Sequence, residues 1–169
     1  TTLGDDKLAV IKNSKLEVLE FTGANNGATL GSNAWAAGIA TIVGGTDNDT
    51  IDASGYSYGI TIDLSRNQVV VGPANTENTV KGGEGNDLII FSNHNVLANS
   101  SLKGNEGIDT LRFAENGISI TDDKFDTARI SNIQVMQTAD GTNYIQVGSN
   151  AEETGLATLV GGTGADTID

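Results

Sequence analysis

The chain has 169 residues, of which 9 are Lys or Arg and 22 are Asp or Glu, so its formal net charge at neutral pH is −13. This charge argues against nucleic acid and anionic membrane surfaces as partners, because both would repel the chain. The absence of cysteine excludes disulfides, thiolate metal sites and cysteine nucleophiles. No run of residues approaches the length of a membrane span, and no signal peptide is visible.

A nine-residue pattern of glycines, one acid and a short strand recurs along the chain. One full copy is GGEGNDLII at residues 82–90, where Asp87 adds a carboxylate to a glycine-rich bend. Glycine takes positive φ at little cost, so such a bend can turn its carbonyl oxygens inward. Carbonyl and carboxylate oxygens are the ligands that calcium prefers. The apolar, branched run after the bend is typical of a buried strand.

In chain order, the pattern starts with a half copy at residues 4–8 (GDDKL), and a copy at 44–52 has Asp47 in place of the third glycine. The copy at 104–112 departs at its second position, whereas 161–169 matches fully. The candidate calcium ligands are the acids of these copies, together with residues at the first and third positions of each bend. They are Asp6, Gly44, Thr46, Asp47, Asp49, Gly82, Glu84, Asp87, Gly104, Glu106, Asp109, Gly161, Thr163 and Asp166.

These copies resemble the G-G-x-G-x-D-x-U-x nonapeptide of the repeats-in-toxin (RTX) family, a calcium-binding β-helix repeat. The resemblance implies a parallel β-roll in which one ion lies between stacked turns and takes ligands from both. It also implies export by a dedicated channel, folding driven by external calcium, and an extracellular or cell-surface location. Related repeat segments occur in bacterial surface-layer, surface-fibril and adhesin proteins.

On this basis Asp87 and Asp109 form the best candidate pair, because their turns start 22 residues apart, close to one coil. Asp49 and Asp166 have no like neighbour at that spacing, and Asp49 would then draw on Asp47 and Asp52. The alternative for every such aspartate is a structural role, in which the carboxylate accepts backbone N–H groups in a tight turn. A solenoid with few ions, held in part by asparagine and threonine hydrogen bonds, is the corresponding alternative for the chain.

A longer internal repeat sets the domain organisation. Residues 17–52 align without a gap on residues 134–169, at an offset of 117. We therefore expect a single solenoid segment, residues 1–169, of a longer repeat protein, with one long repeat at 17–133 and the start of the next copy at 134–169.

The expected fold is all-β, a parallel β-roll or β-solenoid with one or two short helical turns at coil edges. Copies of the glycine pattern start at positions 44, 82, 104 and 161. These starts are separated by close to whole multiples of a coil of about 19 residues, which has room for two short strands and two turns and predicts about nine coils. Strand-like patterns without glycines lie at 60–64, 69–71, 118–120 and 144–147.

Short helical turns are expected at three places. Residues 33–38 combine an N-cap asparagine with a glycine stop, and residues 150–155 repeat this arrangement, with Glu153 where a capping box has an acid. A third turn is expected at residues 121–125, with Thr121 as its cap and Phe125 directed inward.

The function expected from these features is a calcium-binding structural segment of a secreted bacterial surface or assembly protein, and not an enzyme. Calcium and neighbouring repeats of the same chain are the expected partners, with self-assembly and glycan binding left open and no nucleic acid or membrane insertion. No catalytic residues are expected, since the single histidine, His94, lies in a polar turn and the basic residues are scattered. The alternative is an accessory module of a secreted enzyme, such as a polysaccharide epimerase or lyase, that aids folding or binds glycans, and Trp35 is its candidate sugar contact.

Overall fold

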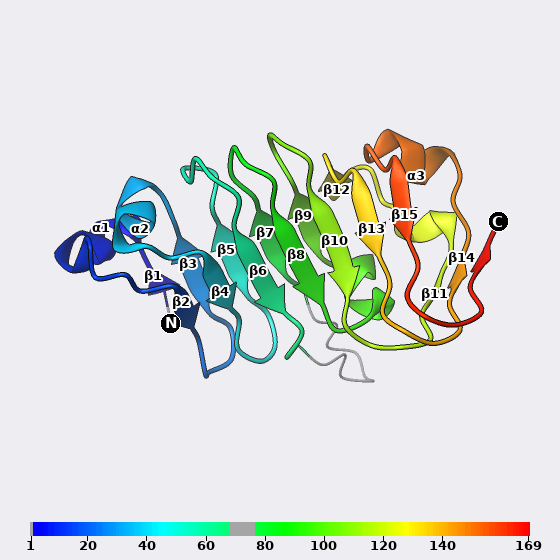
Figure 1. Ribbon diagram of the computed structural model, residues 1–169, viewed down its shortest axis with the longest axis horizontal. Helices are drawn as coiled ribbons and strands as arrows, with labels where there is room; N and C mark the ends of the chain where they lie inside the picture. The colour runs from blue at the N-terminus through cyan, green and yellow to red at the C-terminus, as the bar shows by residue number, and fades with distance from the viewer. Residues whose placement is uncertain (1, 68–76) are drawn as a thin grey trace.

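The computed structural model describes residues 2–67 and 77–169. Its short strands stack side by side along an elongated body, and the two chain ends lie near its opposite ends (Figure 1). All strand pairs among the described residues are parallel. The expected parallel, mainly β architecture is therefore confirmed. The valines of the strand expected at 69–71 lie outside the described residues.

The strands form one six-stranded, one seven-stranded and one three-stranded sheet. The six-stranded sheet contains β1 (Thr2–Leu3), β3 (Gly27–Thr29), β5 (Thr50–Asp52), β7 (Thr79–Lys81), β9 (Ser101–Lys103) and β12 (Ile130–Ser131). The seven-stranded sheet contains β2 (Val18–Glu20), β4 (Thr41–Val43), β6 (Thr61–Leu64), β8 (Leu88–Phe91), β10 (Thr110–Phe113), β13 (Val135–Gln137) and β15 (Thr158–Val160). The three-stranded sheet contains β11 (Ser119–Ile120), β14 (Tyr144–Ile145) and β16 (Thr167–Ile168).

The coils are longer than the sequence pattern predicts. Strands of the seven-stranded sheet begin at positions 18, 41, 61, 88, 110, 135 and 158, so each coil is longer than expected. The reason is that the glycine pattern occupies both sides of the solenoid. Copies 44–52 and 161–169 form exit turns, which leave this sheet, whereas copies 82–90 and 104–112 form entry turns, which lead into it. The gaps 44–82 and 104–161 therefore each include a half coil, whereas the gap 82–104 is one whole coil.

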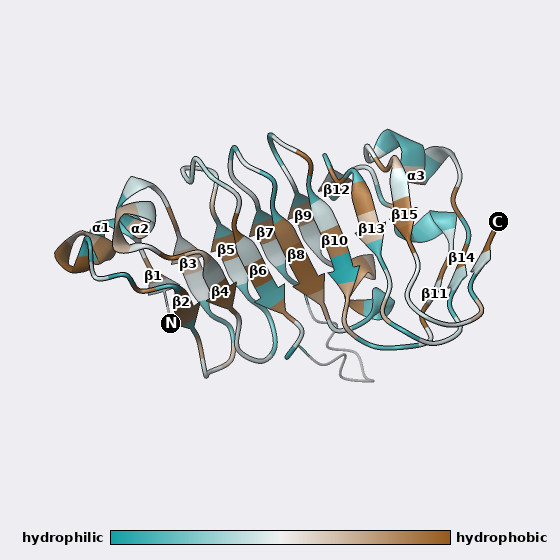
Figure 2. Ribbon diagram, in the orientation of Figure 1, coloured by the Kyte–Doolittle hydropathy of each residue, from teal (hydrophilic) through white to brown (hydrophobic). Residues whose placement is uncertain are grey.

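The core is a column of apolar side chains inside the coils. The middle residue of each paired strand points inward, so Ile42, Ile62 and Ile89 lie in one register and are fully buried. Burial of one such side chain contributes about 1.5–3 kcal/mol to stability. Figure 2 shows apolar residues along the strands, with β8 apolar throughout, and mainly polar residues in the turns. Successive coils are therefore stabilised chiefly by contact with their neighbours.

The strand registers repeat with the same offset of 117 as the sequence. Thr2 pairs with Gly27 and Gly27 with Thr50, while Ser119 pairs with Tyr144 and Tyr144 with Thr167. Each residue of the second set lies 117 positions after its counterpart in the first. The equivalence thus extends back to β1 and includes residues before position 17, where the sequence alignment begins.

Short helices cover coil edges, as expected, and lie near both ends of the molecule (Figure 1). The α-helices are α1 (Asp5–Leu8), α2 (Ser32–Ala37) and α3 (Ser149–Glu153), and the 3₁₀ helices are η1 (Ala9–Ile11), η2 (His94–Ala98) and η3 (Asp122–Lys124). Gly38 ends α2 with φ 91°, in agreement with the expected glycine stop. Thr121 occupies the N-cap position of η3, as expected, but its side chain makes no capping hydrogen bond. Phe125 is buried, as expected.

The helix caps differ from the prediction, because Asn33 and Asn150 lie inside their helices and the N-caps are Gly31 and Gly148. The Asp5 carboxylate instead accepts N–H groups of Gly31 and Ala34, both at 2.8 Å. Asp122, 117 positions later, accepts the N–H groups of Gly148 and Ala151 in the same way, at 2.8 and 2.9 Å. The cap comes from the preceding coil, a contact that a local capping pattern does not include.

Candidate functional site

The entry turns contain a ladder of buried or partly buried polar side chains, each located directly before a strand of the seven-stranded sheet. Asp87 Oδ1 accepts the backbone N–H of Ile60 at 2.9 Å, and Asp109 Oδ1 accepts the N–H of Asp87 at 2.9 Å. Gln134 Oε1 accepts the N–H of Asp109 at 2.7 Å. Each coil therefore supplies an acceptor to the coil before it. The expected adjacency of Asp87 and Asp109 on neighbouring coils is confirmed.

The exit turns contain a second ladder with the same polarity. Asp49 Oδ1 accepts the N–H of Asn26 at 2.8 Å, Asn78 Oδ1 that of Asp49 at 2.9 Å, and Ser100 Oγ that of Asn78 at 3.1 Å. Further along, Asn143 and Asp166 continue the series, since Asp166 Oδ1 accepts the N–H of Asn143 at 3.1 Å. Asp49 and the Asp87–Asp109 pair thus lie on opposite sides of the solenoid.

Sequence reasoning missed the uncharged members of both ladders. They are Asn26, Asn78, Ser100, Gln134 and Asn143, and each directly precedes a strand. A polar residue with a side-chain oxygen at that position is the signal that would have found them. The glycine pattern does not identify these residues, because their turns lack most of it.

The aspartates of the ladders differ from the amides in having a second oxygen. Oδ2 of Asp49 and Oδ2 of Asp109 are buried and accept no hydrogen bond from the residues that the structure describes. Oδ2 of Asp87 accepts the N–H of Gly83 at 2.7 Å. A buried carboxylate oxygen without a partner is costly, so these two atoms indicate where a proton or a cation would be stabilised.

The surroundings of the two unpartnered oxygens are not alike. A Cβ on Gly104 would lie 2.1 Å from Asp109 Oδ2 and 1.8 Å from the carbonyl oxygen of Asn132, so both oxygens pack closely against the same glycine. A Cβ on Gly44 would lie 2.6 Å from Asp49 Oδ2 but 2.4 Å from a methyl carbon of Leu64. Two oxygens therefore lie close together beside the Cα of Gly104, and oxygens are the ligands that a hard cation prefers, whereas one oxygen and one methyl group lie beside Gly44.

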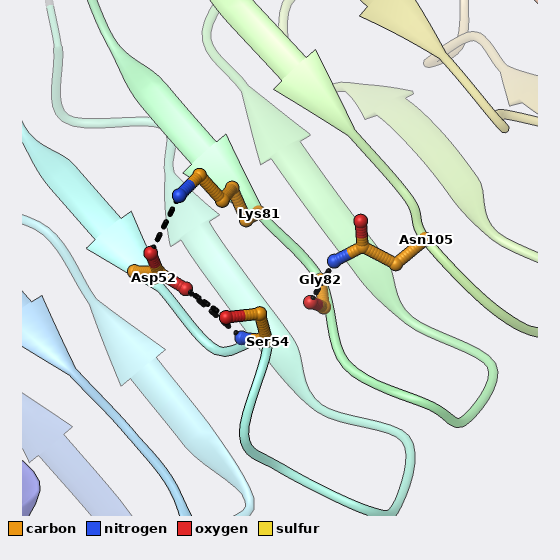
Figure 3. A network of polar contacts seen from close by, with 5 residues as sticks. All are labelled: Asp52, Ser54, Lys81, Gly82 and Asn105. Atoms are coloured by element: carbon orange, nitrogen blue, oxygen red, sulfur yellow. Dashed lines mark hydrogen bonds and ion pairs between the residues drawn. The ribbon is translucent and has the colours of Figure 1, made fainter.

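The turn of the preceding coil offers a second pair of oxygens. A Cβ on Gly82 would lie 2.1 Å from Asp87 Oδ2 and 2.3 Å from the Gly104 carbonyl oxygen. The Gly82 carbonyl oxygen itself accepts a hydrogen bond from Asn105 Nδ2 at 2.6 Å, as Figure 3 shows. An amide NH₂ group thus stabilises a carbonyl that was a candidate ligand.

The remaining candidate ligands lie away from these two pairs of oxygens. The third-position side chains, Thr46, Glu84, Glu106 and Thr163, are exposed. Asp47 is exposed with φ 65°, in the left-handed region that favours glycine. Asp166 is partly buried, and its Oδ2 lies 2.4 Å from the position of a Cβ on Gly161, with no second oxygen nearby.

Two acids have partners that remove them from a calcium turn. Asp6 lies on α1, is exposed and pairs with Lys7 at 3.2 Å, so the prediction of a half turn at residues 4–8 is wrong. Asp52, on β5, pairs with Lys81 at 2.7 Å and accepts hydrogen bonds from Ser54 (Figure 3). These contacts hold the Asp52 carboxylate in an ion pair at the surface. Asp52 is therefore not available as the additional acid that was expected beside Asp49.

No group of three or more His, Cys, Asp or Glu side chains converges on one point among the residues that the structure describes. Any cation here would depend mainly on carbonyl oxygens, as in the pattern inferred from the sequence. In the same part of the chain, no helix has the length and apolar character to cross a membrane. His94 is half-buried at the start of η2, and burial lowers the pKa of its imidazole.

Scans against protein-family models, curated proteins and solved structures found no match to this chain.

Burial governs the electrostatics of the entry ladder. It raises the pKa of the Asp109 carboxyl from 3.8 to about 6, against the opposing hydrogen bond from the Asp87 N–H. It also raises the pKa of Asp87, which accepts the N–H groups of Ile60 and Gly83. Both carboxyls therefore favour a proton or another positive charge more than an exposed aspartate would.

We predict that, in the presence of chelator, the free energy of unfolding falls as pH rises from about 4 to 6. A carboxyl whose pKa is raised from 3.8 in the unfolded chain to about 6 in the fold binds its proton more tightly when folded. Its stabilising contribution is complete below the lower value and lost above the higher one. Urea unfolding across this range measures the slope. Asp109→Asn should flatten the slope, and identical slopes in both proteins would contradict the assignment to Asp109.

We also predict that Asn78→Ala lowers the free energy of unfolding by about 1–3 kcal/mol, since it leaves the buried N–H of Asp49 without an acceptor. Asn116→Ala is the control, because Asn116 is exposed in a turn and should change stability by less than about 0.5 kcal/mol. Equal effects in urea unfolding would show that the ladder does not stabilise the coils.

Proposed function

We propose that the chain is a calcium-stabilised structural segment, an RTX-like solenoid that extends and stiffens a secreted bacterial surface or assembly protein. The observation that carries this proposal is the unpartnered, buried Oδ2 of Asp109, which packs with the Asn132 carbonyl oxygen against Gly104. The turn of Asp87 supports it, since it lies one coil away and its backbone N–H donates to Asp109 Oδ1.

The donor set fits calcium better than it fits a transition metal. It consists of carboxylate and carbonyl oxygens, and cysteine is absent from the chain. Hard oxygen ligands in a flexible, carbonyl-rich turn suit calcium, whereas Mg²⁺ demands a stricter octahedral geometry. Asp109 and Asn132 would hold the ion, with Asp87 and the Gly104 carbonyl on the adjoining turn.

Calcium would also offset charge. The formal net charge is −13, and self-repulsion of this size opposes the compact state. A divalent cation between Asp87 and Asp109 would replace the proton that burial otherwise favours, so the turns could remain stacked at neutral pH. Extracellular calcium is plentiful, which makes a cell-surface or secreted location consistent with the proposal.

We predict that calcium raises the melting temperature and that this gain depends on Asp109. Asp109→Asn should abolish most of the gain while it keeps the acceptor for the Asp87 N–H, because asparagines already occupy ladder positions in this chain. Asp87→Asn should act on the same ion, so the double variant should lose little more than either single one. Calorimetric titration and thermal melts, with calcium and with chelator, measure both effects.

Asp49→Asn is the matched control, since Asp49 has the same ladder bond but a methyl group of Leu64 beside it. It should leave the calcium gain unchanged. The proposal fails if chelator changes neither the β-type circular dichroism nor the melting temperature. If Asp87→Asn and Asp109→Asn each remove a separate ion, the shared site is wrong.

A second candidate function, a glycan-binding accessory module, is favoured by an exposed aromatic pair. Trp35 and Tyr58 stack with ring centroids 5.1 Å apart and an interplanar angle of 11°. About half of each side chain is exposed, and both line a hollow of about 270 Å³ with Ser32 and Ser57. If this is a sugar site, Trp35→Ala should abolish binding on a glycan array, whereas Val10→Ala, at another exposed apolar residue, should not.

A further inference from the structure

An open apolar pocket lies at the end of the seven-stranded sheet formed by β15. Its volume is about 330 Å³, and its walls include Val147, Ala151, Leu156 and Leu159, with Glu152 at one side. β15 is the edge strand of its sheet, so one side of its backbone has no neighbouring strand among the described residues. An open parallel edge beside an apolar pocket is a surface on which a further strand can add.

The same surface occurs a second time in this chain, 117 positions earlier, and there it is covered. The counterparts of the four apolar residues are Leu30, Ala34, Ile39 and Ile42, and each is no more than 1% exposed. Val147, Leu156 and Leu159 are only partly buried. The first copy therefore shows what kind of segment such a surface can accept.

The cover of the first copy is a turn followed by a strand, residues 53–64. The Tyr56 side chain is buried against this surface, and its hydroxyl donates a hydrogen bond to the Ile39 carbonyl oxygen. The strand β6 then pairs with β4, so that Ile62 lies beside Ile42. One aromatic residue and one parallel strand thus close the pocket.

We propose that the pocket at β15 is a docking site for a turn-and-strand segment with the pattern of residues 53–64. Its tyrosine would fill the space between Val147 and Leu156 and donate to the Leu156 carbonyl oxygen, and its strand would pair with β15. The occupant is therefore a further copy of this segment of the repeat. The inference stands on the internal repeat, whether or not calcium binds.

The two copies of the surface differ at the position of Trp35, and this difference provides a test of the proposal. Trp35 of the first copy stacks on Tyr58 of the covering segment, but the counterpart of Trp35 is Glu152. A docked segment would therefore bring its second tyrosine against Glu152. Glu152→Trp should restore the stack and tighten binding by about two- to tenfold, the range expected for an aromatic pair.

The experiment titrates the folded chain into a fluorescein-labelled peptide of residues 52–65 and follows anisotropy, with calcium and with chelator. Saturable binding is expected. The peptide with Tyr56→Ala should bind about tenfold more weakly or worse, because it leaves the pocket unfilled. Leu156→Glu in the chain should abolish binding, whereas Val18→Glu, at the edge strand β2 of the opposite end, should not.

The deciding measurement is a double-mutant cycle between chain and peptide. The gain from Glu152→Trp should disappear when the peptide carries Tyr58→Ala, a result that unfolding of a variant could not produce. The proposal is overturned if no binding is detected, if a scrambled peptide binds equally, or if Leu156→Glu has no effect in a chain whose circular dichroism is unchanged. It is also overturned if sedimentation shows Leu156-dependent dimers that the peptide does not dissociate, since a folded second copy would then be the occupant.

Discussion

The structure depends on hydrogen bonds that run from the side chain at the start of one strand to the backbone of the preceding coil. Parallel strands pair their own backbones, but the residue that enters each strand lies in a turn, where its N–H has no strand partner. Asp49, Asn78, Asp87, Asp109 and Asn143 solve this problem with one oxygen each, and all are buried. The close stacking that results is also why glycines are needed: a Cβ on Gly83 would lie 2.1 Å from the Tyr56 carbonyl oxygen of the coil before it.

The choice between an amide and an acid at a ladder position decides what else the turn requires. Asn26 uses its Nδ2 to bond the Gly23 carbonyl oxygen, and Asn143 does the same for Ala139, so these turns satisfy their own oxygens. An aspartate has no donor to offer, and Oδ2 of Asp109 and the Asn132 carbonyl oxygen pack closely against the same glycine. Asn26 and Asn143 therefore stabilise their own turns, whereas Nδ2 of Asn78 and Oδ2 of Asp109 are buried and have no hydrogen-bond partner among the described residues. Along both ladders, aspartate turns and amide turns alternate irregularly.

The sequence predicted the structural features that are caused by a short local pattern. It did not predict the features that depend on contacts between neighbouring coils. Strands after glycine-rich bends, the parallel class, the stop at Gly38 and the adjacency of Asp87 and Asp109 all follow from short patterns. The coil length was wrong because a turn pattern does not reveal on which side of the solenoid it lies. The cap that Asp5 provides to α2 was missed because its partners lie on the next coil. Asn78 was missed because its turn lacks the glycine pattern, and its partner, the N–H of Asp49, lies on the preceding coil.

The direction of the strand pairing has a mechanical consequence. Because neighbouring strands stack along the length of the molecule, the hydrogen bonds between coils lie nearly parallel to that length. Tension applied to the two ends would therefore load these bonds one coil at a time, and not all together in shear. Each released coil would replace about 4.8 Å of stacked length with roughly 70–90 Å of extended chain. A filament built from such units would dissipate mechanical energy under tension, because it would lengthen in discrete steps while the remaining coils stay folded.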